Sequence, residues 1–160
     1  KSGLRSKEIS LISWKMILKS DGTIDDYINL PNSSTKGNSG RIIPLHKDIK
    51  ENLKSMFIEH KQLYGFNENT SFIVRTERSP FTTSQTIVNM FQKWYGKLGL
   101  LGCSSHSGRR TFITETSKRI SLVGGSLRDI QMMVGHQSLQ TTQRYIEGDS
   151  ESQKKVIDLI

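Results

Sequence analysis

The sequence lacks most of what builds a secreted or membrane-spanning protein. It has a single cysteine, Cys103, so no disulfide can form within its 160 residues, and a reducing, cytoplasmic setting is expected. No apolar run approaches the roughly 20 residues of a membrane span. No basic segment followed by an apolar one opens the chain, as it would in a signal peptide. We therefore expect neither secretion nor a membrane partner.

Groups that bind metal ions are also scarce. None of the four histidines, His46, His60, His106 and His136, stands at zinc-finger spacing with a pair of cysteines. No pair of carboxylates suggests a magnesium site either. The sequence thus predicts no metal site and no cofactor.

Positive charge, by contrast, is plentiful. Lys and Arg number 23 against 15 Asp and Glu, which gives a net charge of +8. A basic domain suits a polyanionic partner, because the phosphates that it neutralises release their counterions. An ordinary soluble basic protein has the same composition, so charge alone does not decide between the two.

The apolar residues, with 34% of the chain hydrophobic, gather in periodic segments that indicate one folded domain. We expect two strands on either side of an Asp-Gly turn within residues 14–31, and a third short strand at 41–45 after a polar loop. Helical patterns occupy the start of the chain and the segments 46–65, 82–99, 106–120, 126–135 and 151–160. The outline predicts an α+β fold, mainly α-helical, with a small three-stranded antiparallel sheet.

One polar segment, GHQSLQTTQRYI at residues 135–146, holds Tyr145 among few apolar neighbours. The other polar positions that stand out are Arg5, Lys36, His106, Arg109 and His136. Two guanidiniums can clamp the oxygens of a phosphodiester, a lysine can protonate a leaving oxygen, and a histidine can accept a proton. A tyrosine can then act as the nucleophile and form a covalent ester. The set suits phosphoryl transfer without a metal ion.

Four segments carry a resemblance to a known family: GLRSKEI, TKGNSGRIIPL, HSGRRTF and VGHQSLQTTQRYI. In order and spacing they resemble the tyrosine recombinases, or phage integrase family, from residue 3 to about 148. The resemblance implies a catalytic domain over residues 1–148 whose start is truncated, with the amino-terminal DNA-clamping domain absent. It also implies a site-specific DNA recombinase that cleaves and rejoins strands through a covalent 3′-phosphotyrosine, without ATP or metal.

The same resemblance implies roles for the residues that carry it. Tyr145 would be the nucleophile, and Arg5 and Arg109 would clamp the phosphate. His106 would act as the base, and His136 would donate a hydrogen bond to the phosphate.

Lys36 completes this catalytic set, and three other residues receive supporting or DNA-binding roles. Lys36 would be the general acid on its loop, and Glu8 would orient Arg5 or His106. Arg41 and Arg110 are expected to contact the DNA backbone, unless they belong to a solvated face.

The implied partner is double-stranded DNA, so the protein would lie with the nucleoid when bound. The resemblance further suggests a homotetramer on DNA in which the tail, residues 149–160, docks on a neighbouring protomer. Packing of this tail onto its own domain is the alternative.

Each candidate residue also has an ordinary explanation when taken singly. Arg5 and Glu8 could form an exposed ion pair, and Lys36 could be solvated. His136 could interact with a helix end, and Tyr145 could pack half-buried. Their joint occurrence in family order favours function. A type IB topoisomerase-like enzyme and an inactive DNA-binding remnant of a mobile element are the alternatives.

Overall fold

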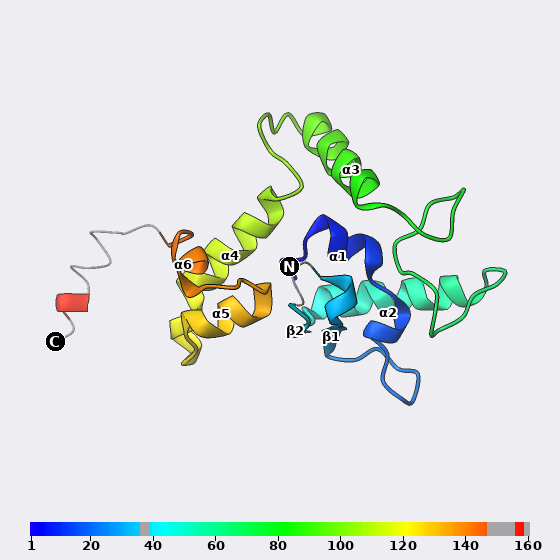
Figure 1. Ribbon diagram of the computed structural model, residues 1–160, viewed down its shortest axis with the longest axis horizontal. Coiled ribbons are helices and arrows are strands. Elements are labelled where there is room, and N and C mark those ends of the chain that lie inside the picture. The colour runs from blue at the N-terminus through cyan, green and yellow to red at the C-terminus, as the bar shows by residue number, and fades with distance from the viewer. Residues whose placement is uncertain (36–38, 147–155, 159–160) are drawn as a thin grey trace.

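Six α-helices and one short hairpin are the regular elements of the part of the chain that the computed structural model describes, residues 1–35, 39–146 and 156–158. The elements in chain order are α1 (Ser6–Leu11), β1 (Tyr27–Leu30), β2 (Arg41–Pro44), α2 (Lys47–Lys61), α3 (Ser84–Lys97), α4 (Ser107–Arg119), α5 (Leu127–Val134) and α6 (Leu139–Gln143). Short 3₁₀ turns lie at Trp14–Met16, Asn32–Ser34 and Ile120–Val123. Helices α4, α5 and α6 gather on the left of Figure 1, α2 lies on the right, and the hairpin lies below α1, where β2 contacts α5.

The sheet is antiparallel but has two strands among the described residues, not the expected three. In the pairing of β1 with β2, Ile28 stands opposite Ile43, and both face the core. The expected strand before them is a 3₁₀ turn followed by a single bridge from Leu18 to Ile24. Trp14 and Ile17, three residues apart, are both fully buried. A strand would send them to opposite faces, whereas a helical turn places both in the core.

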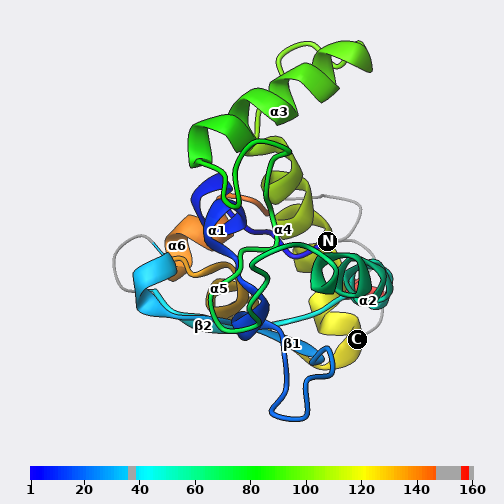
Figure 2. The ribbon, with the colours of Figure 1, turned by 90° about the vertical axis from the view of Figure 1, so that its right-hand side faces the viewer.

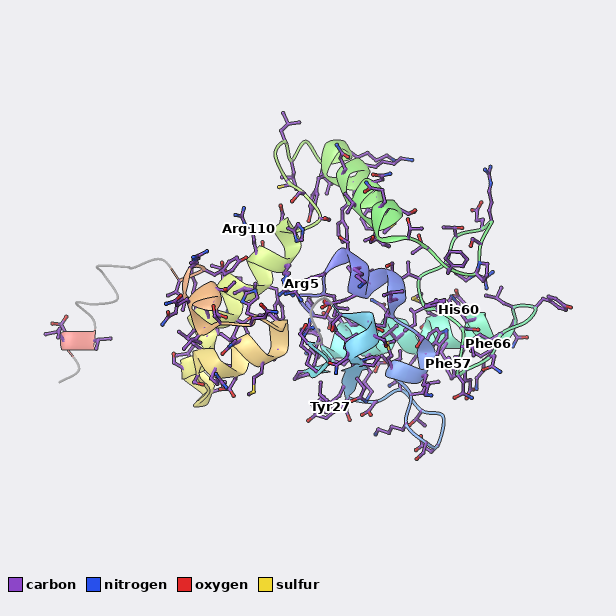
Figure 3. All side chains as sticks on the ribbon, in the orientation of Figure 1. Arg5, Tyr27, Phe57, His60, Phe66 and Arg110 are labelled. Carbon is purple, nitrogen blue, oxygen red and sulfur yellow. The ribbon has the colours of Figure 1, made fainter. Side chains whose placement is uncertain are left out.

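Residues 1–74, the N-terminal region, contain the larger core. Its buried members are Ile12, Trp14, Ile17, Ile24, Ile28, Leu30, Ile43, Leu53, Phe57 and Ile73. The Trp14 ring lies 4.8 Å from Phe57, and its Nε1 donates a hydrogen bond to His60 Nδ1 at 3.1 Å. Figure 3 shows Phe57, His60 and Phe66 together at one end of this region.

Residues 104–146, the C-terminal region, enclose a much smaller core. Ile113, Ile130 and Val134 are fully buried there, and Tyr145 packs against them. Helix α5 stops at Gly135, which has φ +63°, as the sequence predicted. The predicted helix at 46–65 is shorter, because α2 ends at Lys61.

Helix α3 begins at a capping residue and then stands away from the rest of the molecule. The Thr83 hydroxyl accepts from the amide of Thr86, as expected for a helix start. The helix packs against α1 and extends outward beyond it, as Figure 2 shows. Its Trp94 is 49% exposed. No helix in the described part of the chain has the length and apolar character to cross a bilayer.

Candidate active site

The first site arginine, Arg5, stands directly before α1, where Glu8 anchors it. Glu8 Oε2 accepts from the Arg5 amide at 2.8 Å, and Oε1 accepts from Arg5 NH1 at 3.1 Å. The Glu8 carboxylate therefore accepts a hydrogen bond from an otherwise unpaired amide at the helix start and also orients the Arg5 guanidinium. Arg5 NH2 also donates to the carbonyl of Gly135 at 3.1 Å. Figure 3 shows Arg5 between the two regions.

Glu8 is almost completely buried, with 1% of its surface exposed. Burial opposes its charge, but hydrogen bonds from Arg41 and the Arg5 amide, with the charges of both arginines, lower the pKa of Glu8 below its usual value. The expected pairing of Glu8 with Arg5 is present. Its second partner, Arg41, is buried as well.

The second site arginine, Arg109, lies in the first turn of α4 and is 6% exposed. Its NH2 donates to the carbonyl of Val134 at 2.6 Å, and its NH1 donates to the carbonyl of Gly3. Burial and the nearby charge of Arg5 lower the pKa of Arg109 to about 10. The guanidinium therefore stays charged at neutral pH and is held by main chain from both regions.

His136 follows the glycine that ends α5 and is held from several sides. Its ring Nδ1 lies 3.0 Å from the hydroxyl of Thr142, which is fully buried. Gln131 binds its main chain: the His136 amide donates to the Gln131 carbonyl, and Gln131 Nε2 donates to the His136 carbonyl. Burial, then the charges of Arg109, Arg5 and Arg41, lower the pKa of His136 to about 4. The imidazole is thus neutral at physiological pH.

Tyr145 lies just beyond α6, with its ring stacked on that of His136. The two ring centroids are 5.8 Å apart and the planes differ by 18°. A pocket of about 370 Å³ is lined by Ser104, His106, Arg109, Arg110 and Tyr145.

His106 and Arg110 are exposed, in contrast to Arg109. His106 is the residue before the first turn of α4, and Arg110 points outward from that helix in Figure 3. The helix is not tightly packed at Gly108, since an added Cβ there would meet only the Tyr95 hydroxyl at 3.7 Å.

The structure brings together Arg5, Glu8, Arg109, His136 and Tyr145, from segments far apart in the sequence. Lys36 lies outside the described residues, so its predicted role stays a prediction. Arg41, expected to contact the DNA backbone unless it belonged to a solvated face, does not lie on a solvated face. Its side chain is 7% exposed and is paired with Glu8 instead of solvent.

Sequence reasoning identified Glu8 as a support of Arg5 but not the two residues that hold His136. Thr142 and Gln131 are buried polar residues on α6 and α5. The sequence shows two threonines shortly before Tyr145. Their place in a helix does not reveal that the hydroxyl of Thr142 faces His136.

The assembled group combines the pocket that Tyr145 lines with Arg109 and the neutral imidazole of His136, which stacks on the Tyr145 ring. Positive charge held in a partly buried site stabilises an anion more strongly than it would in water. The arrangement can therefore bind a phosphate beside the Tyr145 hydroxyl. Within the described residues, no group of three or more His, Cys, Asp or Glu side chains could hold a metal ion.

Known proteins are similar to this chain in both sequence and architecture. A family model described as "Phage integrase family" matches residues 1–152. Tyrosine recombinase XerC of Chlamydia muridarum is 28% identical over 158 residues, which cover 98% of this chain and 46% of that protein. XerC of Thermodesulfovibrio yellowstonii is 32% identical over 129 residues, 77% of this chain and 41% of that protein.

The fold itself occurs in the Tn1549 transposon integrase, solved in complex with a circular intermediate DNA. The match has a TM-score of 0.73 at 17% identity and covers 99% of this chain and 55% of that one. The two chains therefore share one fold. The chain belongs to the phage integrase family. It spans less than half the length of the two XerC relatives.

Proposed function

We propose that this chain is the catalytic part of a site-specific DNA recombinase that breaks and rejoins strands through a covalent 3′-phosphotyrosine. The observation that carries the proposal is the position of Tyr145, which lines a pocket with His106 and Arg109 and stacks on His136. Its relatives are tyrosine recombinases, which supports the same conclusion.

In the proposed reaction the Tyr145 oxygen attacks a DNA phosphorus and loses its proton to a base, His106. The bond from phosphorus to the 5′ oxygen breaks, and Lys36 protonates that leaving oxygen. Attack by the 5′ hydroxyl of a partner strand then releases Tyr145 and restores the DNA backbone. The number of phosphoester bonds is conserved at each step, so the reaction needs no ATP.

The environment of each described residue supports its proposed role. Arg5 and Arg109 would bind the non-bridging oxygens and stabilise the charge of the five-coordinate transition state. His136 is neutral, because burial and the neighbouring arginines lower its pKa to about 4, so it would donate a hydrogen bond without accepting a proton. The exposed Arg110 would contact the DNA backbone.

The proposed substrate is double-stranded DNA, in line with the DNA complex of the Tn1549 integrase. We infer a homotetramer on DNA, joined by exchange of the tail at 149–160, and action in the cytoplasm at the nucleoid. Most of this tail lies outside the described residues. Its Val156 and Ile157 are 57% and 68% exposed, which leaves both available to a neighbouring protomer. Ile157→Asp should abolish the tetramer on DNA, as measured by sedimentation.

The decisive experiment uses the full-length protein and nicked suicide duplexes from DNA that flanks its gene. We expect a protein–DNA adduct that withstands denaturant and is absent from Tyr145→Phe. Tyr64→Phe is the matched control, because Tyr64 is fully exposed, and it should form the adduct normally. Binding without an adduct in the wild type would instead favour an inactive DNA-binding remnant. An adduct with plasmid relaxation but no strand exchange would favour a type IB topoisomerase.

A further inference from the structure

Arg41 is a buried cation outside the proposed catalytic set. It opens β2 and follows Lys36 closely in the sequence. Its NH1 and NH2 donate to the two carboxylate oxygens of Glu8 at 2.9 and 3.0 Å. A guanidinium fits a carboxylate in this two-bond manner, which fixes both side chains in one geometry.

The bond to Glu8 connects Arg41 to the phosphate clamp. Glu8 Oε1 accepts from both Arg41 NH1 and Arg5 NH1, at 2.9 and 3.1 Å. One carboxylate oxygen is therefore shared by two guanidiniums. Because Arg41 holds Glu8, and Glu8 holds Arg5, a change at position 41 must alter the support of Arg5.

A second set of contacts connects Arg41 to the turn before His136. Arg41 Nε donates to the carbonyl of Met133, near the end of α5, at 2.7 Å. The backbone of Gly135 lies directly against the guanidinium, since a Cβ at that position would stand 2.9 Å from Arg41 NH1. The Gly135 carbonyl in turn accepts from Arg5. The turn therefore depends on both arginines for its position.

We propose that Arg41 is a positioning residue, which holds Arg5 and the His136 turn at a fixed separation and does not bind DNA. The proposal rests on the recombinase function inferred above. Lysine cannot replace Arg41, because a single ammonium cannot reach both Glu8 oxygens and the Met133 carbonyl together.

The structural part of the proposal is testable without DNA. In amide NMR spectra of the whole protein, Arg41→Lys should shift the signals of residues 5–8 and 133–136, which are distant in sequence. Arg119→Lys is the matched control, because Arg119 pairs with Glu115 on the exposed face of α4. Its shifts should stay near position 119. Shifts confined to residues next to position 41 would overturn the proposal.

The catalytic part is tested by single-turnover cleavage of the suicide duplex at saturating DNA. Arg41→Lys should slow cleavage by roughly 10- to 100-fold, because small displacements of positioned groups have effects of this size. Its Kd for DNA should change by less than about threefold, because the Arg41 guanidinium is already paired with both carboxylate oxygens of Glu8. Arg119→Lys should cleave at the wild-type rate.

Each alternative has a distinct result. Weaker DNA binding with a normal rate at saturation would make Arg41 a DNA contact and overturn the proposal, as would a wild-type rate and affinity. An absent adduct in the wild type would overturn the recombinase function itself. In that case the amide spectra still decide whether Arg41 connects the two segments.

Discussion

The N-terminal and C-terminal regions differ in the amount of apolar surface that each one buries. In the N-terminal region, a continuous cluster of buried apolar side chains surrounds Trp14. In the C-terminal region the buried apolar cluster consists of Ile113, Ile130 and Val134, with partly buried hydrophobic neighbours around them. Apolar burial stabilises in proportion to area, so most of the apolar stabilisation comes from the N-terminal region, while His136 and Tyr145 belong to the other.

Polar bonds join the two regions. Arg5 and Arg41 reach from the N-terminal region to the carbonyls of Gly135 and Met133, and Arg109 reaches back to the carbonyl of Gly3. Hydrogen bonds from buried charged donors to main-chain acceptors restrict the relative orientation of two segments more strictly than apolar contacts do. The residues of the proposed site are therefore held in position by hydrogen bonds from arginines. The N-terminal region beside them owes its rigidity to its apolar core.

Trp14→Ala should have the largest effect, because it removes the centre of the larger core. We expect the free energy of unfolding to fall by about 3–5 kcal/mol. The indole is fully buried and bonds to His60 through Nε1, so the substitution leaves both a cavity and an unpaired ring nitrogen. Urea denaturation followed by circular dichroism measures the loss. A loss below about 1 kcal/mol would contradict the assignment of stability to this core.

Ile130→Ala should cost less, at the lower end of the roughly 2–5 kcal/mol range for such truncations. Ile130 is fully buried, but its core is small and can relax around the cavity. Ile28→Ala is the matched control in the larger core, where Ile28 is 2% exposed and should cost more. Amide hydrogen exchange should accelerate in residues 107–146 for Ile130→Ala alone. An equal cost for both substitutions would show that the cores are energetically alike.

Local patterns in the sequence predicted most helices but not the tertiary role of single residues. The stop of α5 at Gly135 could be predicted because a glycine with positive φ commonly ends a helix. The conformation of residues 14–18 could not, because a short apolar run fits both a strand and a helical turn. Burial of both Trp14 and Ile17 resolved it.

The site was predictable as a set of residue types in family order, with Glu8 as a support, but the other supporting residues were not. Arg41 follows a glycine in a polar loop, which resembles a solvated cation. Its partner Glu8 is 33 positions away, so no local pattern reveals the pair. The hydroxyl of Thr142 is likewise visible in the sequence, but its bond to His136 arises only from the fold.

A smaller effect concerns pH, because each region contains one histidine whose pKa is lowered. Burial, with the charge of Arg75, lowers the pKa of His60, and the stronger effect on His136 brings its pKa to about 4. The unfolded chain binds protons near pH 6.5, whereas folded His136 does not until about pH 4. Stability should therefore be unaffected by this group above pH 6.5 and decline as pH falls from there towards 4.

Unfolding free energies at pH 7 and pH 5 measure that decline for two variants. His136→Gln should reduce the difference between the two pH values more than His60→Gln does, because its pKa is lowered further. NMR titration of the imidazole signals checks the order directly. A His136 signal that titrates above pH 6 would contradict the prediction and remove the reason for treating this ring as a neutral donor.

The smallest effect on stability is expected for Thr142→Val, which keeps the shape of the side chain and removes its hydroxyl. Thr142 is fully buried, and the oxygen lies 3.0 Å from His136 Nδ1. Loss of one such bond should lower the free energy of unfolding by about 1 kcal/mol. Cleavage should fall more than stability does, because a threonine hydroxyl that donates to Nδ1 leaves the imidazole proton on Nε2, free to reach a phosphate.

The ring nitrogens of His136 distinguish this role from simple packing. With ¹⁵N-labelled histidine, the wild type should show the Nε2–H tautomer, and Thr142→Val should shift the signals towards a mixture of both tautomers. Thr142→Ser retains the hydroxyl and should restore both the tautomer and the cleavage rate. If valine leaves the tautomer and the rate unchanged, the hydroxyl only fills a polar space, and the orientation of His136 must come from Gln131 and the stacked Tyr145 ring.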